Sequence, residues 1–556
     1  MTSSALEQLR ADIEEFAAEY VGNAAYHPVL PPSAKIIHDP VWKTIRLWPW
    51  EVAVLNLPLL QRLRQISQTS LTNYIFPGST HTRFEHTLGV IHHAQRLIDA
   101  TNDGNAEPFS VDTTRNLRLA ALLHDCGHCC FSHLSESIYE AYPDMRAVLG
   151  GDEYRENRPK GHELFSSLIV QSAAFRKFAK ELEARYVEAG LKIDIDRIAN
   201  WVIGRSLPGE EDKVFERQVI YGPFDADKLD YILRDSHYSG LPMGLDLDRL
   251  WAACREGRLE TGERVLTLHQ ASVAPLEQIL FSKTNLFSVV YQHPKVRAAE
   301  RMVEAVFEHI HNTETEEIRG LGKTVRLQKA SDFLWITDDV FFAEAIRRPQ
   351  DDPVHKMIHA IRYRRMLVRA LTISKDTVAD VTKYRRVRKL NNKTESMSEE
   401  KRKLAALICK EVGDDRLTPA DVWIDIPGDP SYGEADQTYV RLPISSGANT
   451  STGKDHKFKT LSDFFPINYW NELFKNHRWR GHVFCPQEWQ QKVHNAAVKV
   501  LERVYGVGFN DLAGHLSHVP VPLVTGDCSG RPVADGKMGG LVAEPETGKA
   551  LTREEP

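Results

Sequence analysis

The stretch "LLHDCGHCCFSHLSE", residues 122–136, combines a strongly apolar pattern with side chains that are costly to bury. It continues from "NLRLAALL", whose apolar residues recur at three- and four-residue steps and predict a buried helix. A buried carboxylate without a partner either destabilises the fold or takes up a proton, so Asp125 needs a compensating group. On one helix, His124 and Asp125 would face a common point and His128 would follow one turn later. We therefore expect a metal site here.

Three further segments with helical periodicity supply the same kinds of side chain. They are His86 in "RFEHTLGV", His162 and Glu163 in "GHELFSS", and Asp225, Asp227 and Asp230 in "FDADKLDYILRDSHY". Taken singly, each also fits a surface residue or a satisfied core residue. Imidazole nitrogens combined with carboxylates suit Mn, Fe, Co, Ni or Zn better than they suit calcium, and Mg is a further candidate. We therefore expect a divalent metal cofactor of one of these kinds.

Cys126, Cys129 and Cys130 give the same stretch the pattern "CGHC", which also occurs in redox enzymes. A thioredoxin-like motif requires a strand immediately upstream, whereas a helical pattern precedes this one. A structural zinc site would require a second Cys or His pair at finger-like spacing, which we do not find. The chain has seven cysteines in all, an odd and sparse number that favours reduced thiols. We expect these three to line the core.

The composition is typical of a soluble globular protein. The 556 residues are 42% hydrophobic and 26% charged, and no apolar run reaches the length of about 18 residues that predicts a membrane span. The net charge of −6 gives no general attraction to nucleic acid or anionic lipid, so an anionic ligand would need a local patch. Together with the cysteine content, these features predict a cytoplasmic protein without a membrane partner.

The periodicity along the chain predicts a mainly α fold, with a large helical core and a smaller C-terminal α/β lobe. We expect an N-terminal helix within residues 1–35, a core over 36–320 that opens with a hairpin in 36–55, a lobe over 321–520 and a flexible tail over 521–556. The strands of the lobe are expected in "IRYRRMLVRALT", "ADVWIDIP", "TYVRLPIS" and "KTLSDFF".

Residues 383–403, "KYRRVRKLNNKTESMSEEKRK", concentrate positive charge. Such a patch could contact nucleotide phosphates across subunits or bind single-stranded nucleic acid. However, Glu395, Glu399 and Glu400 dilute the charge, and Tyr384 is the only aromatic residue in the segment. We therefore favour a solvated loop of alternating charge over a nucleic-acid site.

Several segments together resemble the HD-domain dNTP triphosphohydrolase family, from about Lys35 to beyond residue 470. They are "QRLRQISQ", "FPGSTHTRFEHTLGV", "HDCGHCCFSH", "GHELFSS", "FDADKLDYILRDSHY" and "YQHPKVRAAE". The resemblance implies an HD-domain helical core and metal-dependent hydrolysis of deoxynucleoside triphosphates to deoxynucleoside and triphosphate, which lowers dNTP pools. The alternatives are an HD phosphohydrolase that acts on an NTP, an alarmone or oligonucleotide ends, and a non-catalytic nucleotide sensor.

The resemblance also assigns roles to individual residues. It implies that the metal ligands are His86, His124, Asp125 and Asp227. It implies that the catalytic residues, which line the phosphates and transfer protons, are His128, His133, His162 and Glu136. The substrate-binding residues by the same resemblance are Gln68, Arg83, Lys228, Tyr231, Asp235, Lys283, Tyr291 and Gln292. Lys283 falls near the sequence position at which the family carries a phosphate-contacting arginine. A bidentate phosphate contact would therefore be replaced by a single ammonium charge in this chain.

The family's animal members assemble as tetramers around nucleotide effectors, and the resemblance implies a homo-oligomer whose effector residues are Lys35, Gln61, Arg64 and Arg365. Asn56 replaces an aspartate that reads guanine in that family, and His38 replaces an asparagine. An amide accepts only one of the two guanine N–H groups, so guanine-specific activation is not expected. Thr69 replaces an apolar residue, and its hydroxyl could accept a ribose 2′ hydroxyl, which weakens the expected selectivity for deoxyribose.

Overall fold

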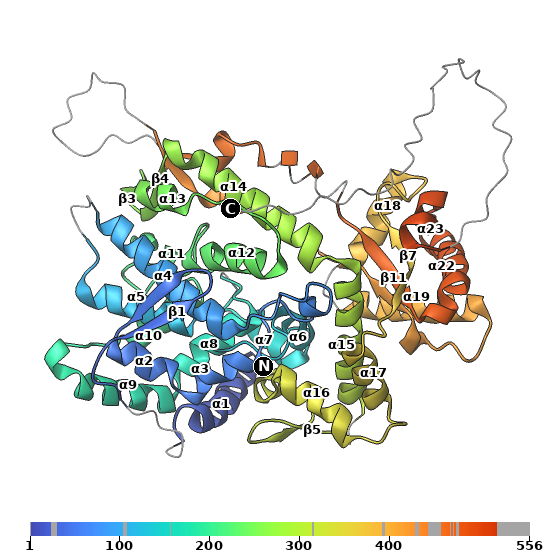
Figure 1. The fold of residues 1–556 in the computed structure, drawn as a ribbon, viewed down its shortest axis with the longest axis horizontal. Coiled ribbons are helices and arrows are strands. Elements are labelled where there is room, and N and C mark those ends of the chain that lie inside the picture. Colours follow the sequence, from blue (N-terminus) through green and yellow to red (C-terminus); the bar gives the residue numbers. More distant parts are fainter. Residues whose placement is uncertain are drawn as a thin grey trace, which may run out of the picture.

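The computed structural model has a helical core with a smaller α/β lobe, so the predicted mainly α fold class is confirmed (Figure 1). It describes residues 2–23, 30–103, 108–155, 157–313, 316–391, 395–428, 433–442, 458–467, 469–470, 472–473 and 478–519. Within these ranges, every helix is too short or too polar to traverse a lipid bilayer. The predicted tail, residues 521–556, lies outside the described residues.

The core contains most of the helices. In chain order they are α1 (Thr2–Tyr20), α2 (Pro49–Leu55), α3 (Pro58–Gln61), α4 (Arg83–Asn102), α5 (Val111–Leu123), α6 (His133–Tyr139), α7 (Pro143–Leu149), α8 (Gly161–Gln171), α9 (Ala173–Arg185), α10 (Ile195–Val202), α11 (Val214–Gln218), α12 (Ala226–Ser239), α13 (Leu247–Ala253), α14 (Val273–Asn285) and α15 (Pro294–Asn312). The helices that follow are α16 (Asp338–Arg347), α17 (Pro353–Arg362), α18 (Val381–Arg388), α19 (Glu395–Val412), α20 (Glu434–Gln437), α22 (Gln490–Tyr505) and α23 (Asp511–Ser517).

The strands are short and form four small sheets. They are β1 (Lys35–Asp39), β2 (Lys43–Leu47), β3 (Cys254–Arg258), β4 (Arg264–His269), β5 (Ile318–Arg319), β6 (Thr324–Val325), β7 (Val368–Ile373), β8 (Trp423–Asp425), β9 (Tyr439–Arg441), β10 (Phe458–Thr460) and β11 (Gly481–Cys485). The pairs β1–β2 and β5–β6 are antiparallel hairpins, and the lobe has the order β7-β11-β8.

Local sequence fixes the ends of the two helices that frame the site. Helix α4 begins where the side chain of Glu85 reaches back to the backbone N–H of Thr82, at 2.8 Å from donor to acceptor. Helix α12 begins where Asp225 accepts from the backbone N–H of Lys228 at 2.8 Å, and it ends at Gly240, whose φ of +74° suits glycine. Both helices bury one face in the core, and α4 packs against α5 and α12.

The fourth sheet joins the two parts of the chain. Its order is β10-β9-β4-β3, so β9 from the C-terminal region pairs in parallel with β4 of the core. The remainder of the lobe has its own buried cluster around β7, β8 and β11, which α18, α19, α22 and α23 cover on the far side of α15 (Figure 1). The predicted strands "TYVRLPIS" and "KTLSDFF" thus belong partly to the core sheet, although the domain boundaries themselves stay predictions.

The structure departs from the local predictions in three places. The hairpin expected in residues 36–55 is confirmed, but it ends at Leu47, because Pro49 and the contact from Glu51 to the Trp48 backbone start α2. The segment 383–403 is not a loop, because α18 and α19 run through it and bury Tyr384. Strands β3, β4 and β11 also lie in segments where no strand was expected.

Candidate metal centre and nucleotide cavity

Helix α5 ends just before the histidine–aspartate pair, and the chain then turns tightly. His124 is the C-terminal cap of α5, and the backbone N–H of His128 donates to the carbonyl of Asp125 at 3.0 Å. The predicted continuous helix through His128 was therefore wrong. Gly127 explains the turn, because a Cβ there would lie only 2.5 Å from the His162 carbonyl oxygen on α8. Phe131 has a positive φ of 56° and completes the reversal.

The turn brings Asp125 and His124 against His86 from α4. One ligand atom from each of these three residues lies within 4.8 Å of the others, and all three side chains are buried. The Nε2 atom of His86 is 3.0 Å from Oδ1 of Asp227 and 3.6 Å from Oδ2 of Asp125. In the described part of the chain, Nε2 of His124 is buried without a hydrogen-bond partner, which is what a metal ligand requires before the ion binds. We call His86, His124, Asp125 and Asp227 the metal cluster.

The charges in this cluster compensate one another. Burial raises the pKa of Asp125, but His124 and the Arg83 guanidinium, whose Nη1 lies 2.7 Å from Oδ2, outweigh it and hold the pKa below its usual range. Burial likewise opposes a charged His86, but Asp227 and Asp230 raise its pKa to about 10. The pocket therefore stabilises positive charge between its carboxylates, and a divalent cation would supply such charge.

A second layer of contacts fixes the His86 ring. Its Nδ1 lies 2.8 Å from Oδ2 of Asp230, so Nε2 points into the cluster. Asp230 in turn accepts from Nε of Arg234 at 2.8 Å and from Nε1 of Trp42, and Arg234 donates to Asp39 at 3.0 Å. Trp42 and Asp39 belong to the β1–β2 hairpin, so this hairpin braces His86 in α4 through Asp230 and Arg234. Sequence reasoning missed Trp42, because a contact across 188 residues leaves no local pattern.

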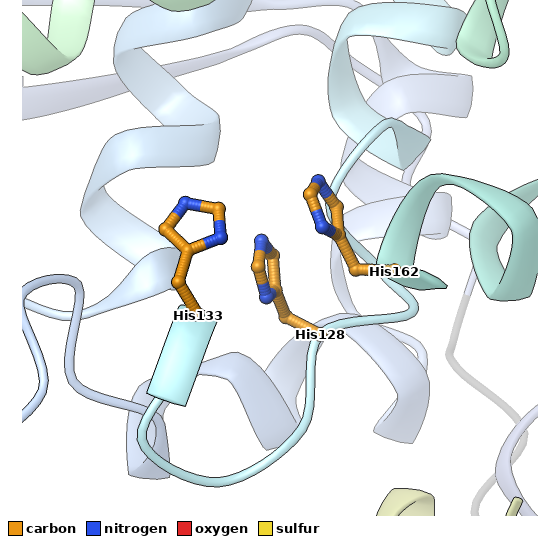
Figure 2. Close-up of side chains that lie close together, drawn as sticks. All are labelled: His128, His133 and His162. Atoms are coloured by element: carbon orange, nitrogen blue, oxygen red, sulfur yellow. The ribbon is translucent and has the colours of Figure 1, made fainter. Parts of the chain in front are cut away.

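Three more histidines, His128, His133 and His162, lie close together (Figure 2). The rings of His128 and His162 are stacked with centroids 3.8 Å apart, and His133, at the start of α6, lies 5.1 Å from His128. Glu136 bridges two of them, with Oε1 at 2.5 Å from Nδ1 of His162 and Oε2 at 2.8 Å from Nδ1 of His133. By spacing alone, these three histidines could also hold a metal.

The Glu136 carboxylate sets the protonation of this histidine group. Burial lowers the pKa of His162, but Glu136 outweighs burial and raises it. Burial raises the pKa of Glu136 itself, but His162 and the hydrogen bond from His133 outweigh burial, so the carboxyl stays ionised. Asp125 connects the two groups, since its Oδ1 is 3.6 Å from Nε2 of His162. A proton on His162 is thus held close to the metal cluster.

Both groups contribute to the wall of one cavity of about 1220 Å³, through His124, Asp125 and Asp227 and through His133, Glu136 and His162. His86 and His128 are fully buried and lie behind this wall. All eight residues expected to bind substrate line it: Gln68, Arg83, Lys228, Tyr231, Asp235, Lys283, Tyr291 and Gln292. The hydroxyl of Tyr291 donates to Oδ2 of Asp235 at 2.5 Å, while Oδ1 of Asp235 is 2.7 Å from Nε2 of His81. His81 was not singled out from the sequence, although it lies in the quoted segment "FPGSTHTRFEHTLGV".

The comparisons with known proteins agree with this arrangement. The sequence pattern of the HD domain matches residues 83–220, and that of the HD associated region matches residues 246–504. The chain belongs to the HD-domain family. It is 27% identical to the human deoxynucleoside triphosphate triphosphohydrolase SAMHD1 over 327 residues, which cover 55% of this chain and 50% of that protein. The Dictyostelium discoideum SAMHD1 homolog is 24% identical over 351 residues, which cover 62% of each chain.

A protein of uncharacterised function from Methanocaldococcus jannaschii, MJ1154, is 29% identical over 316 residues, or 56% of this chain and 58% of that protein. The chain thus spans about half to three-fifths of the length of these curated relatives. The predicted resemblance to the HD-domain family is confirmed. Together, the HD domain and the His/Asp clusters support a metal-dependent phosphohydrolase.

Glu434 is one of the cavity residues of this HD-domain protein that the sequence did not predict. Glu434, in α20, places Oε1 at 2.5 Å from Nζ of Lys283, and its Oε2 is buried without a hydrogen-bond partner in the described residues. Lys228 likewise donates to Asp225 at 2.6 Å. Two cations expected to bind phosphate are therefore paired with carboxylates. The sequence carries no signal for Glu434, because it lies 151 residues from its partner in a short segment beside β9.

The expected effector residues lie outside the cavity, unlike the expected substrate-binding residues. Lys35, Arg64 and Arg365 are exposed, and Gln61 is half-buried. None of the four lines the large cavity. Gln61 donates to the Leu55 carbonyl at 2.8 Å, and Arg64 donates to Gln61 at 2.8 Å while lying over the Phe84 ring. Their effector role stays a prediction.

The cysteine cluster is structural, as predicted. Cys126, Cys129 and Cys130 are fully buried, unpaired thiols in the core. Burial raises the pKa of the Cys126 and Cys129 thiols to about 12, so both remain protonated at neutral pH. A thiolate for redox chemistry or zinc binding is therefore disfavoured at these positions.

Proposed function

We propose that the chain hydrolyses deoxynucleoside triphosphates to deoxynucleoside and triphosphate and thereby lowers dNTP pools. The observation that carries the proposal is the single cavity in which the metal cluster, the histidine group and a set of cations and aromatic side chains meet. The human and Dictyostelium discoideum relatives are named deoxynucleoside triphosphate triphosphohydrolases, which supports a nucleotide as the substrate. Because the chain spans only part of the length of these relatives, the identity of its substrate is proposed here.

The metal cluster would hold the divalent ion, Mn, Fe, Mg, Co, Ni or Zn, through His86, His124, Asp125 and Asp227. A bound ion supplies Lewis-acid chemistry and an activated water for attack on phosphorus. The side chains of the protein would orient the substrate and protonate its leaving group. Arg83, Lys228 and Lys283 neutralise the phosphates, and His162, held by Glu136, gives its proton to the leaving 5′ oxygen. His133 lines the cavity and would contact the phosphates, and the buried His128 ring, predicted to act there too, stacks on His162.

The sugar would lie against Tyr231, Tyr291 and Asp235, with Gln68 at the 3′ hydroxyl and Gln292 near the base. Tyr291 is held by its hydrogen bond to Asp235, and in this proposal its ring would exclude a 2′ hydroxyl. Discrimination between deoxyribose and ribose therefore depends on a braced aromatic ring rather than on a charge.

A second candidate function is hydrolysis of another phosphoester, such as a ribonucleoside triphosphate, an alarmone or oligonucleotide ends. Thr69 favours it, because this half-buried residue lines the cavity and offers a hydroxyl near the sugar residues. A non-catalytic nucleotide sensor is the third. We further propose a cytoplasmic homo-oligomer that binds nucleotides as substrate and as effector, without a membrane partner and with at most a minor contact to nucleic acid.

Product analysis tests these candidates. The purified chain is incubated with Mn²⁺ or Mg²⁺ and each dNTP and NTP, singly and mixed, and the products are separated by chromatography. Deoxynucleoside with intact triphosphate supports the proposal. Ribonucleoside, monophosphate or orthophosphate would favour the second candidate, and no product in any mixture would favour the sensor.

A further inference from the structure

A second, smaller cavity of about 480 Å³ adjoins the catalytic cavity. Four cationic side chains line it, and we call them the basic pocket: Arg146, Arg155, Arg158 and Lys160. The two cavities share Ser137, Glu140, Ala141 and Lys160 in their walls. Lys160 directly precedes Gly161 and His162 at the start of α8. An anion in the basic pocket would therefore lie next to the histidine group.

The charge of this pocket contrasts with that of the chain. The whole sequence carries a net charge of −6, whereas the described residues that line the pocket include four cations and one carboxylate, Glu140. One carboxylate oxygen of Glu140 already has a hydrogen-bond donor, because its Oε1 accepts from the Gly161 backbone N–H at 3.0 Å. Arg155 and Arg158 are exposed, and within the described residues neither guanidinium has a hydrogen bond or ion pair. Two guanidinium groups are thus free to bind an anion.

The loop that carries these arginines is held in an unfavourable conformation. Arg158 has a φ of +44°, which is rare for a residue with a Cβ atom. Its backbone N–H donates to the Tyr154 carbonyl at 2.8 Å, Tyr154 is buried, and Asn157 donates to the Ile203 carbonyl at 3.3 Å. These contacts hold the backbone of Arg158 in place despite the strain, and Arg158 lines the pocket.

We propose that the basic pocket binds a polyphosphate chain, with Arg155 and Arg158 as its principal contacts. Guanidinium groups suit phosphate oxygens because each offers paired N–H donors. The bound polyphosphate could be inorganic triphosphate, which the proposed reaction releases beside Lys160. It could also be the triphosphate tail of a nucleoside triphosphate. The binding site itself stands on the cavity and its charges. Only the origin of the triphosphate rests on the proposed function.

The test is equilibrium dialysis of the full-length, metal-loaded chain against radiolabelled inorganic triphosphate. The test variant is Arg155→Ser with Arg158→Ser, and the matched control is Arg249→Ser with Arg385→Ser, two exposed arginines outside both cavities. We expect the test variant to lose one bound triphosphate per chain, or at least about tenfold in affinity for it, while the control binds as the unaltered chain does. Unfolding temperatures of both variants show that the fold is kept.

A second arm uses a non-hydrolysable nucleoside triphosphate. If only inorganic triphosphate loses a site in the test variant, the pocket serves the free anion; if the nucleotide loses a site as well, it serves the nucleotide tail. Equal binding of inorganic triphosphate to the test variant and the unaltered chain overturns the proposal. Dialysis needs no turnover, so failure of the proposed reaction in product analysis is distinguishable from failure of this site.

Discussion

The metal cluster and the expected effector residues show two different relations between polar atoms and their surroundings. In the metal cluster, His86, His124 and Asp125 are buried, and Nε2 of His124 has no hydrogen-bond partner in the described residues. At the effector positions, Lys35 and Arg64 are exposed to water. Burial without a partner is expensive and calls for a ligand, whereas an exposed cation is already solvated. Geometry alone therefore supports a ligand at the first group but not at the second.

The largest effect should come from Asp125→Ala. Removing this carboxylate takes away a proposed ligand and leaves Arg83 buried without its 2.7 Å partner. We expect hydrolysis to be abolished and metal affinity to fall by at least about a hundredfold, measured by metal analysis and turnover. Asp194→Ala is the control, because it removes a helix-capping carboxylate of α10 outside the site. Full activity with normal metal content in Asp125→Ala would refute the ligand assignment.

His162→Ala should separate metal binding from proton transfer. The alanine removes the imidazole beside Glu136 but none of the four residues of the metal cluster. We expect normal metal content with turnover slowed by about 10² or more, measured as kcat at saturating substrate. An unchanged rate would show that this histidine is structural.

Trp42→Phe should have an intermediate effect. Phenylalanine keeps an aromatic ring beside His93 but loses the N–H that donates to Asp230. Because Asp230 orients His86, metal affinity should fall about tenfold while the fold is retained. Trp48→Phe is the matched control, since Trp48 is 40% exposed and stacks on Trp50. Equal metal affinity in the two variants would mean that the hairpin does not brace the ligand.

The smallest effect is expected for Arg64→Ala. The side chain is exposed and lies over the Phe84 ring, so its loss should lower stability by no more than about 1 kcal/mol. Metal content and the rate without added nucleotide should stay unchanged, and only the response to a second nucleotide should weaken. Loss of metal in this variant would show that the effector residues and the metal cluster are not independent.

The sequence indicated that His86, His124, Asp125 and Asp227 would lie together, because they fall in separate segments with helical periodicity and in the order typical of the HD-domain family. Their role as metal ligands stays a prediction. The sequence did not indicate the turn after His124, because that turn depends on Gly127 meeting the α8 backbone. Glu434 and Trp42 were missed for the same reason: each acts on a residue more than a hundred positions away. The unexpected strands β4 and β11 depend on pairing with distant segments, β9 for β4 and both β7 and β8 for β11, which local propensity does not contain.

The parallel pairing of β9 with β4 makes the two parts of the chain interdependent. In the order β10-β9-β4-β3, β4 is an inner strand only because β9 covers one of its sides. A fragment that ended after residue 428 would leave that side of β4 as an open edge, with backbone N–H and C=O groups free to recruit another chain. The same cut would remove Glu434 from the cavity. The C-terminal lobe thus protects the catalytic half against edge-to-edge aggregation while it completes the wall of its cavity.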